Sequence, residues 1–344
     1  MKAISKLAFV AASLFAASTV LGQTKPPAPA VTVLIGTATA NDTQAEAAEK
    51  FAELLTKYSG GRFKASARTG GSLGTNAQMI AAVQAAALHG MITPAGSMAT
   101  VVPEVSLFDM PFLLPAAPAE MTAFAAQSKA AAKMMEVTEQ KGIHVIGYHG
   151  IGPQSLLTKF PVNKLQDLQG KKFRIIPSLP RVGAYQDWGA ITRPMEFAEV
   201  YGALQQGTID GMQAPPNVLY RMKFHEVTKY YTITEHRGVA ADALMSNTIV
   251  SKKWFDGLPK DLQGVVTKAG METIVWADDA YTSSQKSSLE AMRKTITVTN
   301  MPATELQKMK DLALKGVWER MKNDPQKGPM LKLLEEDVAR FNKK

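Results

Sequence analysis

Strand-like and helix-like segments alternate along this chain, and this order limits the folds open to it. Residues 31–35 (VTVLI) are short and β-branched, which is typical of a buried strand. Residues 48–58 follow with apolar side chains at helical spacing, and the pattern repeats as a strand over 63–67, a helix over 76–88 and a strand over 91–93. Strands joined by crossover helices pair in parallel. The alternation therefore predicts an α/β fold.

The same order continues toward the C-terminus. We expect a helix over 121–137, a short helix over 197–204 and a long helical stretch over 260–294, in which Gly264 and Gly270 mark a kink or a break. The further predicted strands are short and rich in β-branched residues: 144–148, 172–176, 243–251 and 295–299. A chain of 344 residues is long enough for two domains. The pattern thus predicts two α/β lobes.

The N-terminal segment has the pattern of a secretion signal. Lys2 and Lys6 precede the weakly polar to apolar run 7–21, and Val20 and Gly22 are small enough for the positions before a signal-peptidase cut. A membrane anchor is the alternative, but the run is shorter than the roughly 20 apolar residues that span a bilayer. We predict that residues 1–22 are a secretory signal peptide.

Composition removes several function classes. The chain has no cysteine, which excludes a disulfide framework, a thiolate metal site and a cysteine nucleophile. Its formal net charge is +9, but no run of five like charges occurs, which argues against a nucleic-acid-binding arm. A generally basic surface suits the capture of anions.

Catalytic and cofactor-binding motifs are largely missing. The chain has neither the G-x-S-x-G motif of hydrolases nor a phosphate-binding P-loop. His225 and Glu226 resemble the start of a zinc-protease helix, but Lys229 stands where the second histidine is required. The five histidines show no metal-ligand spacing. We therefore expect no enzyme activity, no metal and no cofactor.

Seven short phrases occur in a fixed order along the chain. They are residues 60–63 (GGRF), 70–74 (GGSLG), 108–113 (FDMPFL), 165–174 (LQDLQGKKFR), 199–207 (EVYGALQQG), 210–211 (DG) and 254–261 (WFDGLPKD). In this order they resemble the motifs of the extracytoplasmic solute receptors of TRAP transporters, DctP type. The resemblance covers nearly the whole chain after the predicted signal peptide.

This resemblance implies a two-lobed periplasmic binding protein fold with a hinge and a long bracing helix. We assign residues 31–151 and 240–279 to lobe I, and residues 152–239 and 280–335 to lobe II. Such receptors are not enzymes: they close on a small organic anion in the periplasm and deliver it to the TRAP membrane permease. Some keto-acid receptors pair through an extended helix, so a monomer and a homodimer both fit.

Arg174 is the first candidate for ligand binding. Strand alternation places Lys172, Arg174 and Ile176 on one face. A guanidinium is a planar donor fork that fits both oxygens of a carboxylate. The matching arginine of the resembling family holds the ligand carboxylate, and an exposed arginine at a strand edge is the alternative.

Four further candidates come from positions that match the family's binding residues. Gln154 stands where many relatives have a second arginine, which favours a monocarboxylate over a diacid, unless it is a surface-loop residue. Ala214 replaces a common asparagine, and Gln213 beside it lacks the carboxylate that some keto-acid receptors use toward a metal. Phe197 packs on the ligand in relatives, or belongs to a helix core here. The apolar change at Ala214 favours a 2-keto or 2-hydroxy monocarboxylate, possibly with an apolar or aromatic tail.

The remaining candidates rest on position alone. Thr37, Asn41 and Asn76 lie at expected strand-to-helix turns, where open α/β sheets bind ligands. His236 matches a position that approaches the cleft in sialic acid receptors, although a lone histidine is more often structural. Two other functions stay open: a receptor that docks to a sensor protein, and a periplasmic α/β enzyme.

Overall fold

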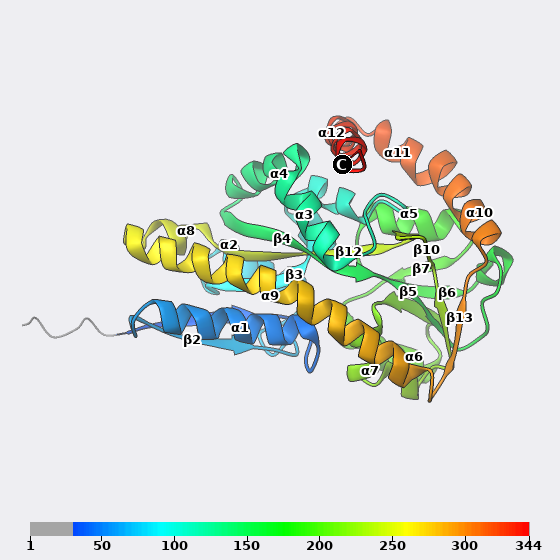
Figure 1. Cartoon of the computed structure of the whole chain (residues 1–344), viewed down its shortest axis with the longest axis horizontal. Helices are drawn as coiled ribbons and strands as arrows, with labels where there is room; N and C mark the ends of the chain where they lie inside the picture. Colours follow the sequence, from blue (N-terminus) through cyan, green and yellow to red (C-terminus); the bar gives the residue numbers. More distant parts are fainter. Residues whose placement is uncertain (1–29, 344) are drawn as a thin grey trace, which may run out of the picture.

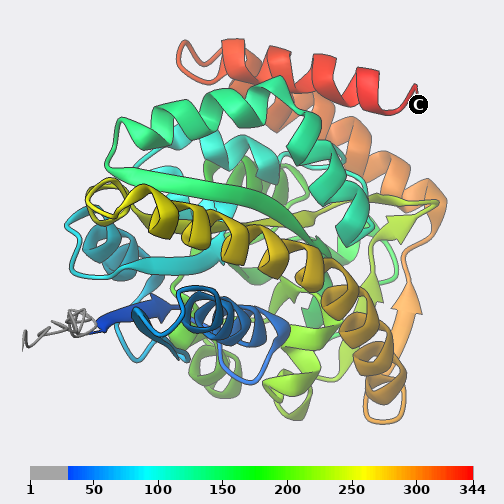
Figure 2. The same cartoon turned by 60° about the vertical axis from the view of Figure 1, so that its left-hand side comes forward.

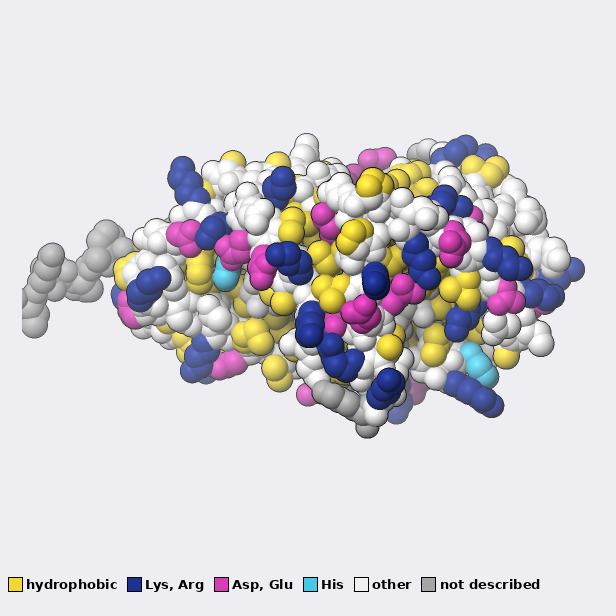
Figure 3. Space-filling view, turned by 90° about the horizontal axis from the view of Figure 1, so that it is seen from above, with side chains coloured by type: hydrophobic (Ala, Val, Ile, Leu, Met, Phe, Trp, Pro, Cys, Tyr) yellow, Lys and Arg dark blue, Asp and Glu magenta, His cyan; other side chains and the backbone are white. Residues whose placement is uncertain are grey.

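The computed structural model describes residues 30–343. The predicted signal peptide over 1–22 lies outside the described residues. Between residues 30 and 343, no helix combines the length and the apolar character that a membrane crossing requires. Seen from above, basic and acidic side chains are interspersed on the surface rather than gathered by sign (Figure 3).

The first lobe is built on a five-stranded sheet with the order β2-β1-β3-β12-β4 (Figure 1). Its strands are β1 (Val31–Gly36), β2 (Phe63–Arg68), β3 (Gly90–Pro94), β4 (Ile143–Pro153) and β12 (Ala243–Ser251). β1 pairs in parallel with β2 and β3, as the helical crossovers predict. β12 runs antiparallel to both β3 and β4.

The second lobe has a six-stranded sheet with the order β13-β9-β5-β8-β6-β7. Its strands are β5 (Ser155–Thr158), β6 (Lys172–Ile175), β7 (Ile191–Pro194), β8 (Gly211–Ala214), β9 (Tyr230–Ile233) and β13 (Thr297–Asn300). β6 pairs in parallel with β7 and β8, whereas β5 runs antiparallel to β8 and β9. A separate hairpin joins β10 (Glu235–His236) to β11 (Val239–Ala240). Both sheets are therefore mixed.

One long helix joins the lobes. α9 (Lys260–Met292) packs on α1 (Thr43–Tyr58) in the first lobe and on α7 (Pro216–Arg221) in the second, as Figure 2 also shows. The helix runs without interruption through Gly264 and Gly270, so the expected break is absent. Gly270 has a packing role instead, because a Cβ there would lie 2.7 Å from the Ile146 side chain of β4.

The predicted helix over 121–137 is two helices, α3 (Pro118–Gln127) and α4 (Lys129–Glu139). Ser128 separates them because its hydroxyl accepts the Ala131 N–H and donates to Asp337 of α12. The predicted helix over 76–88 ends earlier, as α2 (Asn76–Gln84).

The other α-helices are α5 (Leu179–Asp187), α6 (Val200–Gln206), α8 (Lys252–Asp256), α10 (Ala303–Ala313), α11 (Glu319–Lys322) and α12 (Gly328–Phe341). The 3₁₀ turns include η1 (Ala95–Thr100), η2 (Pro103–Asp109), η3 (Leu165–Leu168), η4 (Phe197–Glu199) and η5 (Phe224–Glu226), and a π-turn covers Leu314–Trp318.

A buried ion network lies where the chain crosses between the sheets. Arg181 of α5 is 1% exposed, and its Nη2 lies 2.9 Å from a carboxylate oxygen of both Asp109 and Asp242. Its Nε also donates to Asp242. Burial raises the pKa of both carboxyl groups, and the charge of Arg181 opposes that rise. The arginine therefore compensates two carboxylates that face no water.

We expect Arg181→Leu to lower the free energy of unfolding by about 3–5 kcal/mol, because it leaves two buried carboxylates without a counter-charge. Urea denaturation followed by circular dichroism measures this change. Arg320→Leu is the matched control: Arg320 pairs with Asp187 while its side chain is half exposed. That variant should cost less than about 1 kcal/mol. Equal losses in the two variants would contradict the role of the network.

Candidate functional site

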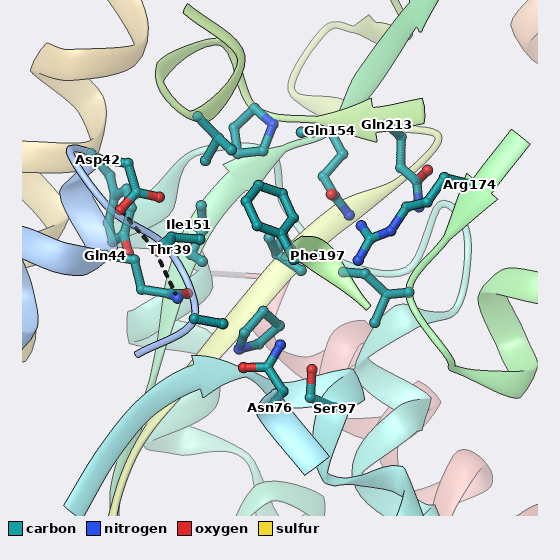
Figure 4. A pocket seen from close by; sticks show the side chains of 18 residues that line it. Thr39, Asp42, Gln44, Asn76, Ser97, Ile151, Gln154, Arg174, Phe197 and Gln213 are labelled. Atoms are coloured by element: carbon teal, nitrogen blue, oxygen red, sulfur yellow. Dashed lines mark hydrogen bonds between the residues drawn. The ribbon is translucent and has the colours of Figure 1, made fainter. Parts of the chain in front are cut away.

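A cavity lies between the two lobes (Figure 4). Both lobes and the segments that connect them supply its walls. The lining residues are Ala38, Thr39, Asp42, Gln44, Asn76, Pro94, Ser97, Ile151, Gln154, Arg174, Ile176, Phe197, Gln213, Ala214, Pro215, Val218, Leu244 and Tyr281.

Six of the nine residues selected from the sequence lie in this lining. They are Asn76, Gln154, Arg174, Phe197, Gln213 and Ala214. They come from five different elements or junctions: the start of α2, the link between β4 and β5, β6, η4 and β8. The fold therefore brings together side chains that are far apart in sequence.

Arg174 dominates the electrostatics of the second-lobe wall. It is 4% exposed, its Nε donates to the Met195 carbonyl at 3.1 Å, and its guanidinium lies 5.6 Å from the centre of the Phe197 ring. Burial, helped by the positive charge of Arg181, lowers the pKa of Arg174 to about 10, so the group stays charged at neutral pH. Within residues 30–343, it forms no ion pair. Ile176 shares the cavity with it, as strand alternation predicts.

Two glutamine amides flank Arg174 (Figure 4). Gln213 on β8 is fully buried, and its Oε1 and Nε2 have no hydrogen-bond partner in the described part of the chain. Gln154 lies at the crossing between the sheets, and its Nε2 contacts Asp242 at 3.3 Å. A buried amide without partners costs free energy unless something else bonds to it. Gln213 is thus available to a bound molecule.

The first-lobe wall is polar and was only partly foreseen. Asp42 is the N-cap of α1: its Oδ1 accepts the Ala45 N–H at 2.9 Å and the Thr39 hydroxyl at 2.8 Å. Sequence reasoning did not select Asp42, Gln44 or Tyr281, all three of which line the cavity. The usable signal for Asp42 was its place at the first strand-to-helix turn. No local signal distinguishes Tyr281 on α9 from a packing residue.

Three selected residues do not line the cavity. Thr37 is buried beside it and accepts a hydrogen bond from Gln44 at 2.7 Å. Asn41 is exposed with a φ of 57°, a left-handed conformation that asparagine tolerates. His236 is exposed in the β10–β11 hairpin. Thr37 and Asn41 lie in the expected turn between β1 and α1, but their side chains are not part of the cavity lining.

The lobes touch beside the cavity. Asn217 of α7 donates to the Thr43 hydroxyl of α1 at 3.2 Å, and Arg221 pairs with Glu46 of the same helix. These contacts join the first turn of α1 to the opposite lobe. The structure therefore holds the lobes against each other, with the cavity enclosed between them.

Two mixed α/β lobes, a long helix across both and a cavity at their junction define a two-lobed solute-binding protein. The family model for bacterial extracellular solute-binding protein, family 7 (DctP) matches residues 35–324. The chain belongs to this family of TRAP periplasmic receptors. The predicted family and fold class are confirmed.

Individual relatives agree with this assignment. The chain is 32% identical over 268 residues to a solute-binding protein of Sulfitobacter sp. (strain NAS-14.1), covering 77% of each chain. It is 30% identical over 226 residues to the ectoine/5-hydroxyectoine-binding periplasmic protein UehA of Ruegeria pomeroyi, covering 64% of this chain and 65% of UehA, just under two thirds. A TRAP solute-binding protein of Desulfovibrio salexigens with bound orotic acid superposes with a TM-score of 0.83 at 25% identity, covering 90% of this chain and 99% of the other.

His149 is a buried histidine that makes the stability of the fold depend on pH. The ring is 1% exposed, lies 6.2 Å from the Tyr281 ring, and has no hydrogen-bond partner among the described residues. Burial lowers its pKa to about 4, below the usual 6.5. Between these values the unfolded chain binds the proton more readily than the folded protein does. The contribution of His149 to stability is therefore full above pH 6.5 and falls as the pH drops toward 4.

The free energy of unfolding should decrease as the pH falls from 7 to 4. We expect this decrease to be about 2–3 kcal/mol smaller in His149→Phe than in the wild type. Urea denaturation of wild type and variant at four pH values measures the difference in slope. His236→Gln, which removes an exposed histidine, should follow the wild-type curve. Parallel curves for wild type and His149→Phe would show that the imidazole does not titrate across this range.

Proposed function

We propose that this chain captures a small organic carboxylate in the periplasm and delivers it to the TRAP membrane permease. One observation carries the proposal: Arg174 is a buried cation in the cavity wall without an anionic partner in residues 30–343. Removing a charge from water costs several kcal/mol unless an opposite charge compensates it. A ligand carboxylate supplies that charge and can accept two parallel hydrogen bonds from the guanidinium.

The lining favours a ligand with one carboxylate at this end. Arg174 is the only cation among the described lining residues, so a second carboxylate would enter without a counter-charge. Gln213 and Gln154 can donate to a keto or hydroxyl oxygen next to the carboxylate. Apolar side chains cover much of the remaining wall, including Ile151, Phe197 and Leu244. We therefore propose a 2-keto or 2-hydroxy monocarboxylate, and the orotic acid in the Desulfovibrio relative supports a carboxylate ligand.

Binding without turnover is the proposed mechanism. Chemistry on the ligand would need a nucleophile beside a general base. Ser97 and Asp42 both belong to the described lining, but the hydrogen bonds of Asp42 go to Ala45 and Thr39 and not to Ser97. Ligand contacts to Arg174 in one lobe and to the first-lobe wall in the other favour the closed arrangement, since a ligand stabilises the state that it binds more tightly. The predicted signal peptide supports a periplasmic site of action.

Arg174→Gln tests the carboxylate site directly. Loss of a buried charged partner costs roughly 2–5 kcal/mol, so the affinity for a carboxylate should fall about 30-fold to several thousand-fold. A thermal-shift screen of small acids first finds binders, and titration calorimetry then measures their Kd.

Arg193→Gln is the matched control for this experiment. Arg193 faces Arg174 in register on the neighbouring strand β7, but it is exposed and outside the cavity lining. This variant should bind like the wild type. Carboxylate binding that survives Arg174→Gln, or binding restricted to sugars or amines, would refute the proposed function.

A further inference from the structure

The wall opposite Arg174 holds a second polar group without a partner. Asp42 is fully buried, and its Oδ1 already accepts two hydrogen bonds within the first turn of α1. Its Oδ2 is buried in the cavity lining and accepts none within residues 30–343. In Figure 4, Asp42 and Arg174 lie on opposite sides of the cavity, with Phe197 between them.

The helix cap does not account for this second oxygen. An N-cap needs one side-chain acceptor, which serine, threonine or asparagine provides equally well. The Oδ1 atom of Asp42 meets that need alone. The carboxylate therefore has an additional buried oxygen that the local fold does not use.

Two of the neighbouring donor side chains, Gln44 and Arg221, are engaged elsewhere. The Gln44 side-chain amide donates to Thr37 and Thr39, and Arg221 pairs with Glu46. Tyr281, also in the lining, has a buried hydroxyl that bonds to no other described residue. Asp42 Oδ2, which accepts no hydrogen bond from the described side chains, can therefore accept one from a molecule bound in the cavity.

The charge state of Asp42 determines which partner fits. Burial raises the pKa of Asp42 to about 6, and the charge of Arg221 opposes the rise. A group with that pKa is about nine-tenths ionised at pH 7. An ionised carboxylate only accepts hydrogen bonds, so its partner has to be a donor.

We infer that the ligand is bifunctional: its carboxylate pairs with Arg174, and a hydroxyl or ammonium group at its other end donates to Asp42 Oδ2. This inference rests on the proposed carboxylate site and narrows its ligand class. It predicts that unsubstituted fatty acids are poor ligands, because they would leave Asp42 buried and unpartnered. The two polar groups come from different lobes, so a ligand that reaches both links them.

Three series of straight-chain acids test the inference. Each series has four, five or six carbons, with a terminal hydroxyl, a terminal ammonium or a terminal methyl group; pentanoate, 5-hydroxypentanoate and 5-aminopentanoate are the five-carbon members. Titration calorimetry on the chain without residues 1–22 measures each Kd. We expect at least one donor-bearing acid to bind tenfold or more tightly than the methyl-terminated acid of equal length. Preference for the hydroxyl or for the ammonium series identifies the donor.

Asp42→Asn is the decisive variant. Asparagine keeps the cap acceptor but replaces the second oxygen with a donor, so the preference for a terminal donor should fall to threefold or less. Serine at this position also caps the helix and lacks the carboxylate, so Asp42→Ser should lose the preference for a terminal donor as Asp42→Asn does. Melting temperatures of both variants check that the fold is intact.

The outcomes separate this inference from the proposed function. Carboxylates that bind through Arg174 without any preference for a terminal donor overturn the inference and leave the proposed function standing. A donor preference that persists in both Asp42 variants also overturns it. Absence of binding by every acid in these series and in the thermal-shift screen, or binding that ignores Arg174→Gln, overturns both.

Discussion

Arg181 of the second lobe and its partners Asp109 and Asp242 form a buried link between the lobes, and the position of Gln154 in the cavity wall depends on it. Asp242 lies at the crossing into β12, and it contacts both Arg181 and the side chain of Gln154. A buried ion network with several hydrogen bonds tolerates little displacement, because each lost partner leaves an uncompensated charge. The segment that carries Gln154 into the cavity wall is therefore tied to α5 of the second lobe.

The cavity is polarised by charges that come from different lobes. The positive charge of Arg174 is buried on β6, and the carboxylate of Asp42 is buried at the first turn of α1. Because neither has a full set of partners in the described chain, each can contribute strongly to the binding of a molecule in the cavity. Contacts between α1 and α7 close the lobes around this arrangement.

Short-range patterns predicted most of the elements. The β-branched runs and helical spacing located β1, α1, β2, β3 and β12, since these signals are local. The break at Ser128 was missed because the serine is recruited by Asp337 from a distant helix. The continuity of α9 was uncertain for a similar reason: Gly270 weakens a helix locally, but it also permits close packing on Ile146. Tertiary contacts decided both cases.

The sequence by itself determined the α/β class, the family and a set of binding candidates led by Arg174, because periodicity and ordered motifs are properties of the chain. Only the tertiary structure decided which of those candidates meet. It gathered six of them around one cavity, placed Asn41 and His236 at the surface, and added Asp42 and Tyr281. The physical reason is that the hydrogen-bond partners of a buried atom come from elements that are distant in sequence. Whether such an atom has a partner is therefore decided only when these elements pack together.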